Sequence, residues 1–291
     1  MSGLEHFDIA AWDVDIDANL SARALDALES GRVLVLPLPF TLLDSEQSLL
    51  SASMDGSRKN ISFNPVNHQI KGAGDDAAQA AALRGLLSRY HRQTRRLAVH
   101  LLPDYRASLQ DGRTSYRPTE VAGRKVSSYR KDDTRLHVDA FPATPVQGRR
   151  MLRFFTNINP HGEPRCWNLG EPFQDVARRF FPRVSAPSAL AAHLMAAVKI
   201  TKSLRSAYDH TMLQIHDGMK ADVDYQATVN KMSAEFAPGT TWVVYSDQVS
   251  HAALAGRYMM EQTFYVPVSA MRYPERSPLR VLEKLAGRTL L

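Results

Sequence analysis

The sequence predicts an α+β fold, with helices first and an antiparallel sheet or barrel after them. The chain has 291 residues, of which 44% are hydrophobic and 23% charged, and these fractions are ordinary for a globular protein. Apolar residues recur at helical spacing in the first third of the chain, whereas from residue 124 onward most apolar runs are of β type. Since no linker-like stretch divides these regions, we expect a single domain over residues 1–291.

Two helices and one strand are predicted in the N-terminal part. Residues 19–29 should form a short helix, because alanine and leucine side chains share one of its faces, and Gly31 ends it. Residues 32–38 follow as a buried strand. A long helix with a leucine-rich stripe is predicted over residues 75–101, and Pro103 stops it.

The later part of the chain is predicted to supply the sheet. Four β-type runs are the candidate strands: Arg124–Arg130, Arg150–Ile158, Thr241–Tyr245 and Tyr258–Val266. A helical stretch over Ser188–Gln214 interrupts them, within a helical insert expected at roughly residues 185–235. Pro238 and Gly239 form a turn directly before the third of these strands.

Charge is unevenly distributed along the chain. Residues 1–30 carry seven acidic side chains and one basic side chain, residues 84–150 carry fifteen basic and six acidic ones, and the whole chain has a formal charge of +6. A basic surface attracts anionic partners such as acidic small molecules or anionic lipid. We do not expect a nucleic-acid partner, because the sequence lacks the interleaved aromatic residues and the motifs of nucleic-acid-binding modules. For residues 1–30 we expect only packing and solubility.

Three features favour a cytoplasmic protein that does not cross a membrane. Cys166 is the single cysteine, so no disulfide can form within the chain, which fits a reducing compartment. The apolar-rich run Val33–Leu43 has only eleven residues, whereas a membrane-spanning helix needs about 20. The N-terminus is acidic and lacks the basic-then-apolar pattern of an export signal.

The motif with the clearest chemistry is His137-Val138-Asp139, together with His251, which lies 112 residues beyond the aspartate. We expect His137 and Asp139 on an extended segment just after the strand at 124–130, where alternate side chains point the same way. Two imidazoles and one carboxylate leave three coordination positions of a metal open, which is the arrangement of non-haem Fe(II) oxygenases. A bidentate 2-oxo acid and O2 can occupy those positions.

Two other functions stay open for the same residues. A zinc hydrolase could use His137, Asp139 and His251 to activate a water molecule. A sugar- or phosphate-binding module would need no metal at all. Succinate production distinguishes the oxygenase from the hydrolase, because only the oxygenase consumes an oxo acid.

Arg153 is a candidate for binding the carboxylate of the oxo acid, because it interrupts an apolar run at residues 151–155. With the two-residue period of a strand, Arg153 and Asn157 share one face. If that face lines the interior, Arg153 could hold the carboxylate with both guanidinium nitrogens and Asn157 could add a hydrogen bond. If it is the outer face, Arg153 is a solvated surface residue.

Four blocks of the sequence resemble the Kdo hydroxylase family, where Kdo is 3-deoxy-D-manno-oct-2-ulosonic acid. The resemblance covers most of residues 30–270, and its blocks are Val126–Pro142, Arg150–Pro160, Thr201–His210 and Trp242–Ala252. It implies Fe(II)/2-oxoglutarate-dependent hydroxylation of carbon 3 of a Kdo residue on a lipid A precursor, with release of succinate and CO2. It also implies a double-stranded β-helix, a jelly-roll or cupin-like core with N-terminal and inserted helices packed outside.

By the same resemblance, His137, Asp139 and His251 match the metal triad. Fe(II), 2-oxoglutarate and O2 are the implied cofactor and co-substrates, with ascorbate as a stimulating reductant. In jelly-roll oxygenases the strand after the distal histidine commonly presents a basic residue to the distal carboxylate of 2-oxoglutarate, and Arg257 is the candidate here. Arg153 stays as its rival.

The implied substrate is an anionic glycolipid, Kdo-lipid A, so basic side chains near the metal motif are candidate contacts. These candidates are Arg130, Lys131 and Arg135 and, in the helical insert, Lys202, Arg205, His210 and His216. A basic face also attracts anionic lipid, and we expect peripheral association with the cytoplasmic face of the inner membrane. A different substrate, either a protein side chain or a small molecule, stays open.

Overall fold

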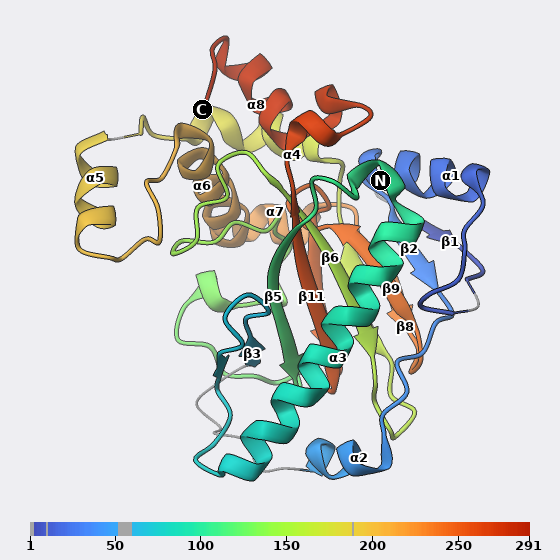
Figure 1. Cartoon of the computed structure of the whole chain (residues 1–291). Coiled ribbons are helices and arrows are strands. Elements are labelled where there is room, and N and C mark those ends of the chain that lie inside the picture. The colour runs from blue at the N-terminus through green and yellow to red at the C-terminus, as the bar shows by residue number, and fades with distance from the viewer. Residues whose placement is uncertain (1–2, 10, 52–59, 188) are drawn as a thin grey trace.

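Two β-sheets lie at the centre of the molecule (Figure 1). The computed structural model describes residues 3–9, 11–51, 60–187 and 189–291. Helix α3 (Ala77–Leu101) crosses the larger sheet, and most other helices gather around the ends and edges of the sheets.

The larger sheet contains eight strands of the described chain, in the order β1-β2-β9-β6-β11-β5-β3-β4. β1 and β2 pair in parallel, and every other neighbouring pair is antiparallel. In sheet order, these strands are β1 (Leu4–His6), β2 (Val33–Leu36), β9 (Thr241–Tyr245), β6 (Arg150–Asn157), β11 (Met259–Val266), β5 (Gln110–Arg117), β3 (Ile61–Phe63) and β4 (Ile70–Lys71).

The smaller sheet is antiparallel and has the order β10-β7-β8 in the described chain. Its strands are β10 (His251–Ala255), β7 (Arg165–Leu169) and β8 (Met232–Phe236). The ring of Trp167 on β7 lies 5.2 Å from that of Phe155 on β6, and Phe236 on β8 stacks on Trp242 of β9 at 4.1 Å. These buried aromatic contacts join the inner faces of the two sheets.

The two faces of β6 have different environments, as the two-residue period of a strand requires. Leu152 and Phe154 belong to the core that the sheet forms with α3. Phe155 belongs to the aromatic cluster between the sheets, and Arg153 on the same face lines a cavity. Arg153 therefore lies on the inner face, which decides the question that the sequence left open.

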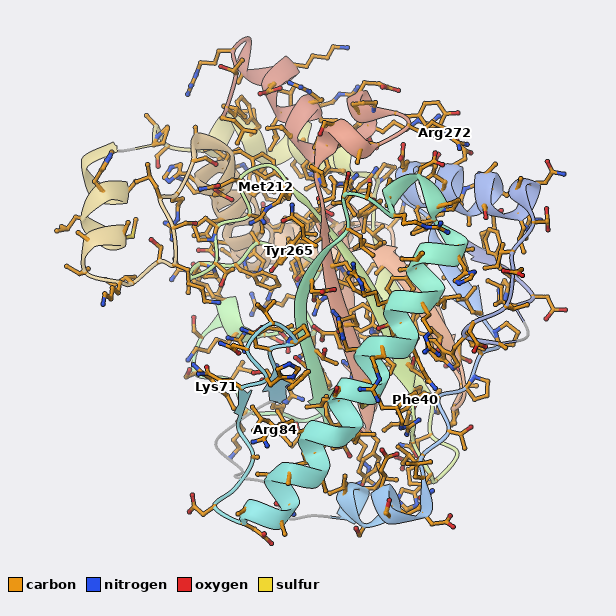
Figure 2. All side chains as sticks on the ribbon, viewed as in Figure 1. Phe40, Lys71, Arg84, Met212, Tyr265 and Arg272 are labelled. Carbon is orange, nitrogen blue, oxygen red and sulfur yellow. The ribbon has the colours of Figure 1, made fainter. Side chains whose placement is uncertain are left out.

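Helix α3 begins where Asp76 accepts hydrogen bonds from the backbone N–H groups of Ala78 and Gln79. Its predicted leucine-rich stripe is buried. Part of this stripe packs against Phe40, whose ring lies 5.1 Å from that of Tyr90 on α3, and Figure 2 shows Phe40 beside the helix. The helix covers the face of the large sheet opposite the smaller sheet, and the cavity that Arg153 lines is on the other face.

The remaining helices build a second apolar core at one end of the sheets, to which α4, α6, α7 and α8 all contribute. α6 begins at a capping box formed by Ser206 and Asp209. The helices not yet given bounds are α1 (Ala18–Glu29), α2 (Asp44–Ser51), α4 (Phe173–Phe180), α5 (Ala189–Ala197), α6 (Ala207–Ala221), α7 (Val223–Thr228) and α8 (Pro278–Ala286). Among the described residues, none of these helices nor α3 has the length and apolarity needed to cross a bilayer.

Most of the predicted elements are confirmed. The helices expected at residues 19–29 and 75–101 are α1 and α3, and the strand expected at 32–38 is β2. The three strands predicted after residue 150 are β6, β9 and β11.

The strand predicted at Arg124–Arg130 is wrong. This segment is irregular and ends in a single turn of 3-10 helix at Tyr129–Lys131. The side chain of Arg124 donates to the backbone carbonyls of Thr119 and Glu120, which holds the segment in a local turn. Its two apolar side chains, Val126 and Tyr129, are not buried, so packing does not recruit the segment into a sheet.

The helical stretch predicted at residues 188–214 is two helices, α5 and α6, with an irregular segment between them. The capping box at Ser206 starts a new helix, which explains the break. Ser188 lies outside the described residues. The insert expected to about residue 235 is not helical to its end, because β8 begins at Met232.

The acidic N-terminal residues make contacts within the fold. Glu5 pairs with Arg23 and Arg32 at 3.3 and 2.8 Å. Glu29 is buried and accepts a hydrogen bond from the hydroxyl group of Tyr105 at 2.7 Å. This segment therefore packs against the body of the protein, as the sequence led us to expect.

Candidate metal centre

His137, Asp139 and His251 meet at the edge of the smaller sheet. His251 begins β10, and its backbone exchanges two hydrogen bonds with that of His137, at 3.0 and 2.9 Å. The backbone N–H of Asp139 donates to the Ser246 carbonyl at 2.8 Å. Pairing with His251 of β10 thus positions His137, and the hydrogen bond to Ser246 positions Asp139, in place of the preceding strand that the sequence predicted.

The side chains of the triad converge, since one potential ligand atom from each lies within 4.8 Å of the others, and all three are buried. Nδ1 of His137 donates to the Arg135 carbonyl, and Nδ1 of His251 donates to the Val249 carbonyl, both at 2.8 Å. Each ring therefore keeps the lone pair of Nε2 for a metal. Two imidazoles and one carboxylate fit Fe(II) and leave coordination positions open.

The surroundings hold the triad in the protonation state that metal ligation needs. Burial lowers the pKa of His137 well below its usual value, and the neighbouring His251 lowers it further. Burial likewise lowers the pKa of His251. Burial alone would raise the pKa of Asp139, but the positive charge of Arg153 lowers it far below its usual range. The imidazoles are therefore neutral and the carboxylate is ionised at neutral pH.

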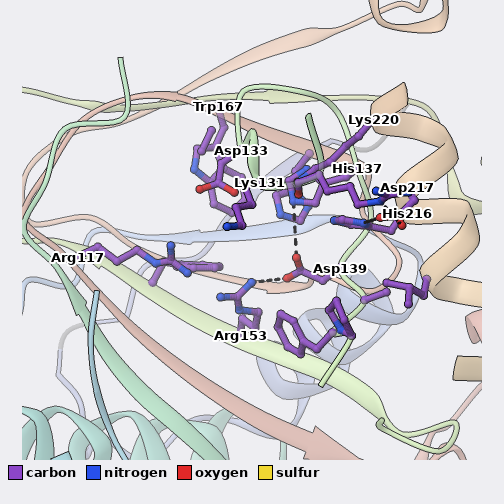
Figure 3. Close-up of a pocket in the computed structure, with 18 of the residues that line it drawn as sticks. Arg117, Lys131, Asp133, His137, Asp139, Arg153, Trp167, His216, Asp217 and Lys220 are labelled. Atoms are coloured by element: carbon purple, nitrogen blue, oxygen red, sulfur yellow. Dashed lines mark hydrogen bonds and ion pairs between the residues drawn. The ribbon is translucent and has the colours of Figure 1, made fainter. Parts of the chain in front are cut away.

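Arg153 connects the triad to the larger sheet. Its guanidinium forms ion pairs with Asp139 and with Glu261 of β11, and Figure 3 shows it directed at Asp139. Burial alone would lower the pKa of Arg153, but Glu261 and Asp139 raise it above its usual value. Nε of Arg153 has no hydrogen-bond partner among the described residues. Arg153 thus orients Asp139 and retains one donor.

The triad lines a cavity of about 530 Å³ whose walls are rich in cations (Figure 3). Its lining includes Arg117, Phe155, Arg165, Trp167 and Met259 from the sheets, His216, Asp217 and Lys220 from α6, and Arg130, Lys131 and Asp133 from the segment before His137. This volume is in the range of small-molecule sites, and the cations favour anionic ligands.

Arg165 on β7 is a buried cation with no carboxylate within ion-pair distance among the described residues. Its Nη1 donates to the Gly256 carbonyl at 2.7 Å, while its Nε has no partner in the described chain. Burial, together with the nearby positive charge of Arg117, lowers the pKa of Arg165 to about 10. A buried guanidinium with an unused donor is suited to binding a carboxylate.

The sequence reasoning missed Arg117, Arg165 and Trp167. In β7, Arg165, Trp167 and Leu169 are buried and alternate with partly exposed neighbours. An arginine in phase with inward-facing apolar residues is the same pattern that identified Arg153. It could have identified Arg165 as well, if this short strand had been predicted.

Arg257 and Asn157, the other candidates for binding 2-oxoglutarate, do not line the cavity. Arg257 pairs with Glu163 at 3.4 Å and lies over the ring of Tyr258. The side-chain amide of Asn157 donates to two backbone carbonyls, at 3.0 and 2.9 Å. Of the three candidates, the structure brings only Arg153 to the triad.

Some of the candidate substrate contacts do line the cavity. Arg130 and Lys131 contribute to its wall. His216 on α6 also lines it, with its ring 5.3 Å from that of His137. These side chains lie where a substrate near the metal would meet them.

The other candidates lie elsewhere. Arg135, Arg205 and His210 do not line the cavity, and each donates to a backbone carbonyl instead. Lys202 lines a neighbouring cavity. Their prediction as contacts of the sugar at the metal gains no support from these positions.

Residues 11–289 match the sequence profile of the 3-deoxy-D-manno-oct-2-ulosonic acid (Kdo) hydroxylase family. No curated protein compared with this chain matches it. A crystal structure of the Kdo hydroxylase, a non-haem Fe(II) α-ketoglutarate-dependent dioxygenase, in complex with α-ketoglutarate and Fe(III) has 42% sequence identity and a TM-score of 0.95. The match covers 100% of this chain and 98% of that one.

Two further structures of the Kdo hydroxylase are equally similar in sequence. The cobalt(II) complex has 42% identity and a TM-score of 0.96, over 99% of this chain and 97% of that one. The complex with succinate and Fe(III) has 42% identity and a TM-score of 0.93 over the same shares. The fold, the converging triad and both comparisons agree, and the chain therefore belongs to the Kdo hydroxylase family of Fe(II)/2-oxoglutarate-dependent dioxygenases.

Proposed function

We propose that this protein hydroxylates carbon 3 of a Kdo sugar on a lipid A precursor, using Fe(II), 2-oxoglutarate and O2. The observation that carries the proposal is that the buried triad and the unpaired Arg165 line the same cavity. A zinc hydrolase would need no receptor for an oxo acid, so this arrangement favours the oxygenase. The relatives whose structures contain α-ketoglutarate or succinate with iron support the same choice.

Iron would be held by Nε2 of His137 and of His251 and by a carboxylate oxygen of Asp139. When bound, the metal supplies the oxidation of a C–H bond by O2, coupled to conversion of 2-oxoglutarate into succinate and CO2. The ion pair with Arg153 fixes the carboxylate of Asp139 before the metal arrives. Such pre-organisation would hold the three protein ligands in place and leave the remaining coordination positions of the metal to the co-substrate.

Arg165 is the proposed receptor for the distal carboxylate of 2-oxoglutarate, with Arg117 beside it. Arg117 already pairs with Glu261 at 2.7 Å, so Arg165 carries the charge that is left to neutralise. Trp167 lies next to this position, with its ring stacked on that of His251 at 4.9 Å. Its indole and the neighbouring Phe155 give the co-substrate apolar walls that exclude water from the reaction.

The sugar is proposed to enter on the side of the cavity formed by α6 and by the segment before His137. Arg130 and Lys131 line that side together with Lys220. Kdo is a sugar acid, so these cations can bind its carboxylate. His216 and Asp217, which hydrogen-bond to each other at 3.0 Å, are placed to contact sugar hydroxyl groups.

The two sheets are proposed to form the double-stranded β-helix of this enzyme class, as a single domain over residues 1–291. Two mainly antiparallel sheets packed face to face support this proposal, as does a triad held at the edge of the smaller sheet. The helices pack outside the sheets (Figure 1).

Helix α5 and the turn after it are proposed to attach the protein to anionic lipid at the cytoplasmic face of the inner membrane. The side chains of Leu194 and Ile200 are 62% and 61% exposed, with Lys199 between them in sequence. α5 projects from the body of the protein (Figure 1), and apolar side chains next to cations fit an anionic lipid surface. Arg205, just beyond, donates to the carbonyl of Pro142 on the cavity lining, and this contact supports a membrane surface close to the site.

The test of the proposed function is product analysis with purified protein, Fe(II), ascorbate and 2-oxoglutarate, with and without Kdo-lipid A. We expect succinate in proportion to a glycolipid that has gained one oxygen atom, and we expect neither product from the His137→Ala variant. Zn²⁺ in place of Fe(II) should give no succinate. Succinate formation that ignores the glycolipid would contradict the substrate, and succinate formation that survives in His137→Ala would contradict the metal site.

A further inference from the structure

A second cavity, of about 480 Å³, lies beside the metal cavity. Arg117, Arg153, Phe141 and Pro142 line both cavities, so the two share a wall. The floor of the second cavity comes from β5 and β11, and Figure 2 shows one of its lining residues, Tyr265, on β11. A molecule bound at the metal can therefore extend into this space.

Arg113 and Lys202 bring positive charge to the second cavity that no carboxylate neutralises within 4.0 Å among the described residues. Arg113 has one hydrogen bond from its guanidinium, a long one of 3.5 Å to the Ser62 hydroxyl. The backbone N–H of Lys202 donates to the Ala143 carbonyl at 3.0 Å, which fixes this lysine at the cavity wall. Burial, with the repulsion of Arg113 and Lys71, lowers the pKa of Lys202.

Two carboxylates also line this cavity, but basic partners already neutralise both. Asp111 pairs with Arg95 at 2.7 Å and contacts His91 at 3.1 Å. Glu261 lies between Arg117 and Arg153 and pairs with each of them. The charge that remains is that of Arg113 and Lys202, and neutral donors surround it, including Asn60, Asn64, Ser115, Thr144 and Tyr265.

The spacing along β5 relates the two cavities to each other. Arg113 and Arg117 lie four residues apart on β5, about 13 Å along the strand, and both line the second cavity. Arg113 lines the second cavity and not the cavity of the triad, so an anion at Arg113 lies apart from the sugar that reacts at the metal. It can be a second group on the same extended molecule.

We propose that Arg113 and Lys202 form a second anion subsite, which binds a carboxylate or phosphate group of the glycolipid next to the sugar that is hydroxylated. This inference rests on the proposed function, and it adds the reason why a glycolipid and not a free sugar would be the substrate. The two sources of the oxyanion are a second sugar acid and a phosphate of lipid A.

The test measures binding of Kdo-lipid A, in detergent micelles, to protein loaded with Fe(II) and 2-oxoglutarate without O2, so that no turnover occurs. We expect the Kd of the Arg113→Gln/Lys202→Gln variant for a glycolipid with two Kdo units and both phosphates to rise about tenfold or more. Its affinity for 2-oxoglutarate and its melting temperature should stay those of the wild type. Arg178→Gln, on α4 and 70% exposed, is the matched control that should change nothing.

Two further glycolipids identify the anion, one without phosphates and one with a single Kdo unit. The group whose removal abolishes the difference between wild type and variant is the group that the subsite binds. A glycolipid Kd unchanged by the double substitution would overturn the proposal, as would a difference that persists equally with both shortened glycolipids. Adding O2 to the same wild-type sample tests the proposed function separately, because absence of hydroxylated product would refute it whatever the binding result.

Discussion

Arg165 shows at the residue scale how this fold combines stability with ligand binding. Its guanidinium is buried, and among the described residues its Nε lacks a partner. Removing a cation from water without a counter-charge destabilises a protein, and replacement of buried ionic groups by apolar ones is often neutral or stabilising. Asp133 and Glu120 partly offset the charge of Arg165, and the carboxylate of 2-oxoglutarate would supply an ion-pair partner.

We therefore expect Arg165→Met to weaken 2-oxoglutarate binding by about 100-fold or more while the protein without ligand melts at no lower temperature than the wild type. Calorimetric titration and thermal melting measure the two effects. Arg178→Met is the matched control, since Arg178 is exposed on α4. A melting temperature clearly below that of the wild type, with 2-oxoglutarate affinity retained, would show that Arg165 is structural.

The lowered pKa of Glu261 predicts that the free energy of unfolding depends on pH. Burial alone would raise its pKa, but Arg117 and Arg153 lower the pKa below its usual value in the fold. A carboxyl group with a lowered pKa stabilises the fold above its unfolded pKa of about 4.3, and this contribution disappears as the pH falls through the folded pKa. Glu261→Gln should therefore cost about 3–5 kcal/mol at pH 7, because the buried Arg153 and the partly exposed Arg117 lose their shared partner.

Urea unfolding of the metal-free protein at several pH values measures this difference. The gap in free energy of unfolding between wild type and Glu261→Gln should narrow steadily below about pH 4. A gap that is the same at all pH values would mean that the charge of Glu261 contributes nothing.

The residues of the triad could be predicted from the sequence, because histidine and aspartate are recognisable metal ligands and two of them stand in a His-x-Asp motif. Arg153 could be found because a charge inside an apolar run needs a partner. Arg165 was missed because its environment depends on β7 being a strand. Arg257 follows His251 closely in sequence, but it pairs with Glu163 outside the cavity.

At the element scale, the long and periodic segments were predictable and the short ones were not. α3 and β6 carry enough apolar residues for a helix and a strand, respectively, to be predicted from the sequence. β7 and β10 have five residues each, and their pairing with distant segments decides their conformation. The strand predicted at 124–130 is wrong because its two apolar side chains, Val126 and Tyr129, are not buried and supply little packing energy.

The turn after β10 contains Gly256, whose close contacts with Arg165 lead to a prediction about 2-oxoglutarate binding. Gly256 has φ +104°, and a Cβ there would lie 2.9 Å from the Pro164 carbonyl oxygen and 3.0 Å from Cα of Arg165. Gly256→Ala should therefore cost about 2–3 kcal/mol and weaken 2-oxoglutarate binding, because Arg165 must move. Gly123, with φ +71° and no atom within 4 Å of the added Cβ, is the matched control.

Gly123→Ala should cost about 1 kcal/mol of backbone strain and leave 2-oxoglutarate affinity unchanged. Urea unfolding and calorimetric titration of both variants give the comparison. Equal costs in the two variants, with equal affinity, would mean that crowding at Gly256 does not position Arg165.

At the scale of the whole molecule, the uneven charge of the sequence is partly cancelled inside the fold. Glu5 pairs with Arg32 at 2.8 Å, and Asp26 of α1 pairs with Arg276 at 2.8 Å. Basic residues of the middle of the chain line the two cavities, which composition alone could not locate.

Membrane attachment through α5 predicts that binding of the protein to anionic vesicles depends on the exposed apolar side chains of this region. Leu194→Glu combined with Ile200→Glu should weaken co-sedimentation with anionic phospholipid vesicles about tenfold or more, because two exposed apolar side chains are lost and two negative charges added. 2-Oxoglutarate affinity and melting temperature should not change. Val223→Glu, at a 67% exposed position on α7, is the control, and an equal loss of vesicle binding there would contradict a role specific to α5.

The most direct test of the central claim is the Fe(II) stoichiometry of the protein, measured by anaerobic titration in the presence of 2-oxoglutarate. The geometry predicts one tightly bound Fe(II) per chain in the wild type and in Arg178→Met. Single substitutions of His137, Asp139 or His251 by alanine should each abolish this tight binding in a protein that still folds. Tight binding of one Fe(II) that persists in any of these three variants would show that the triad does not hold the metal.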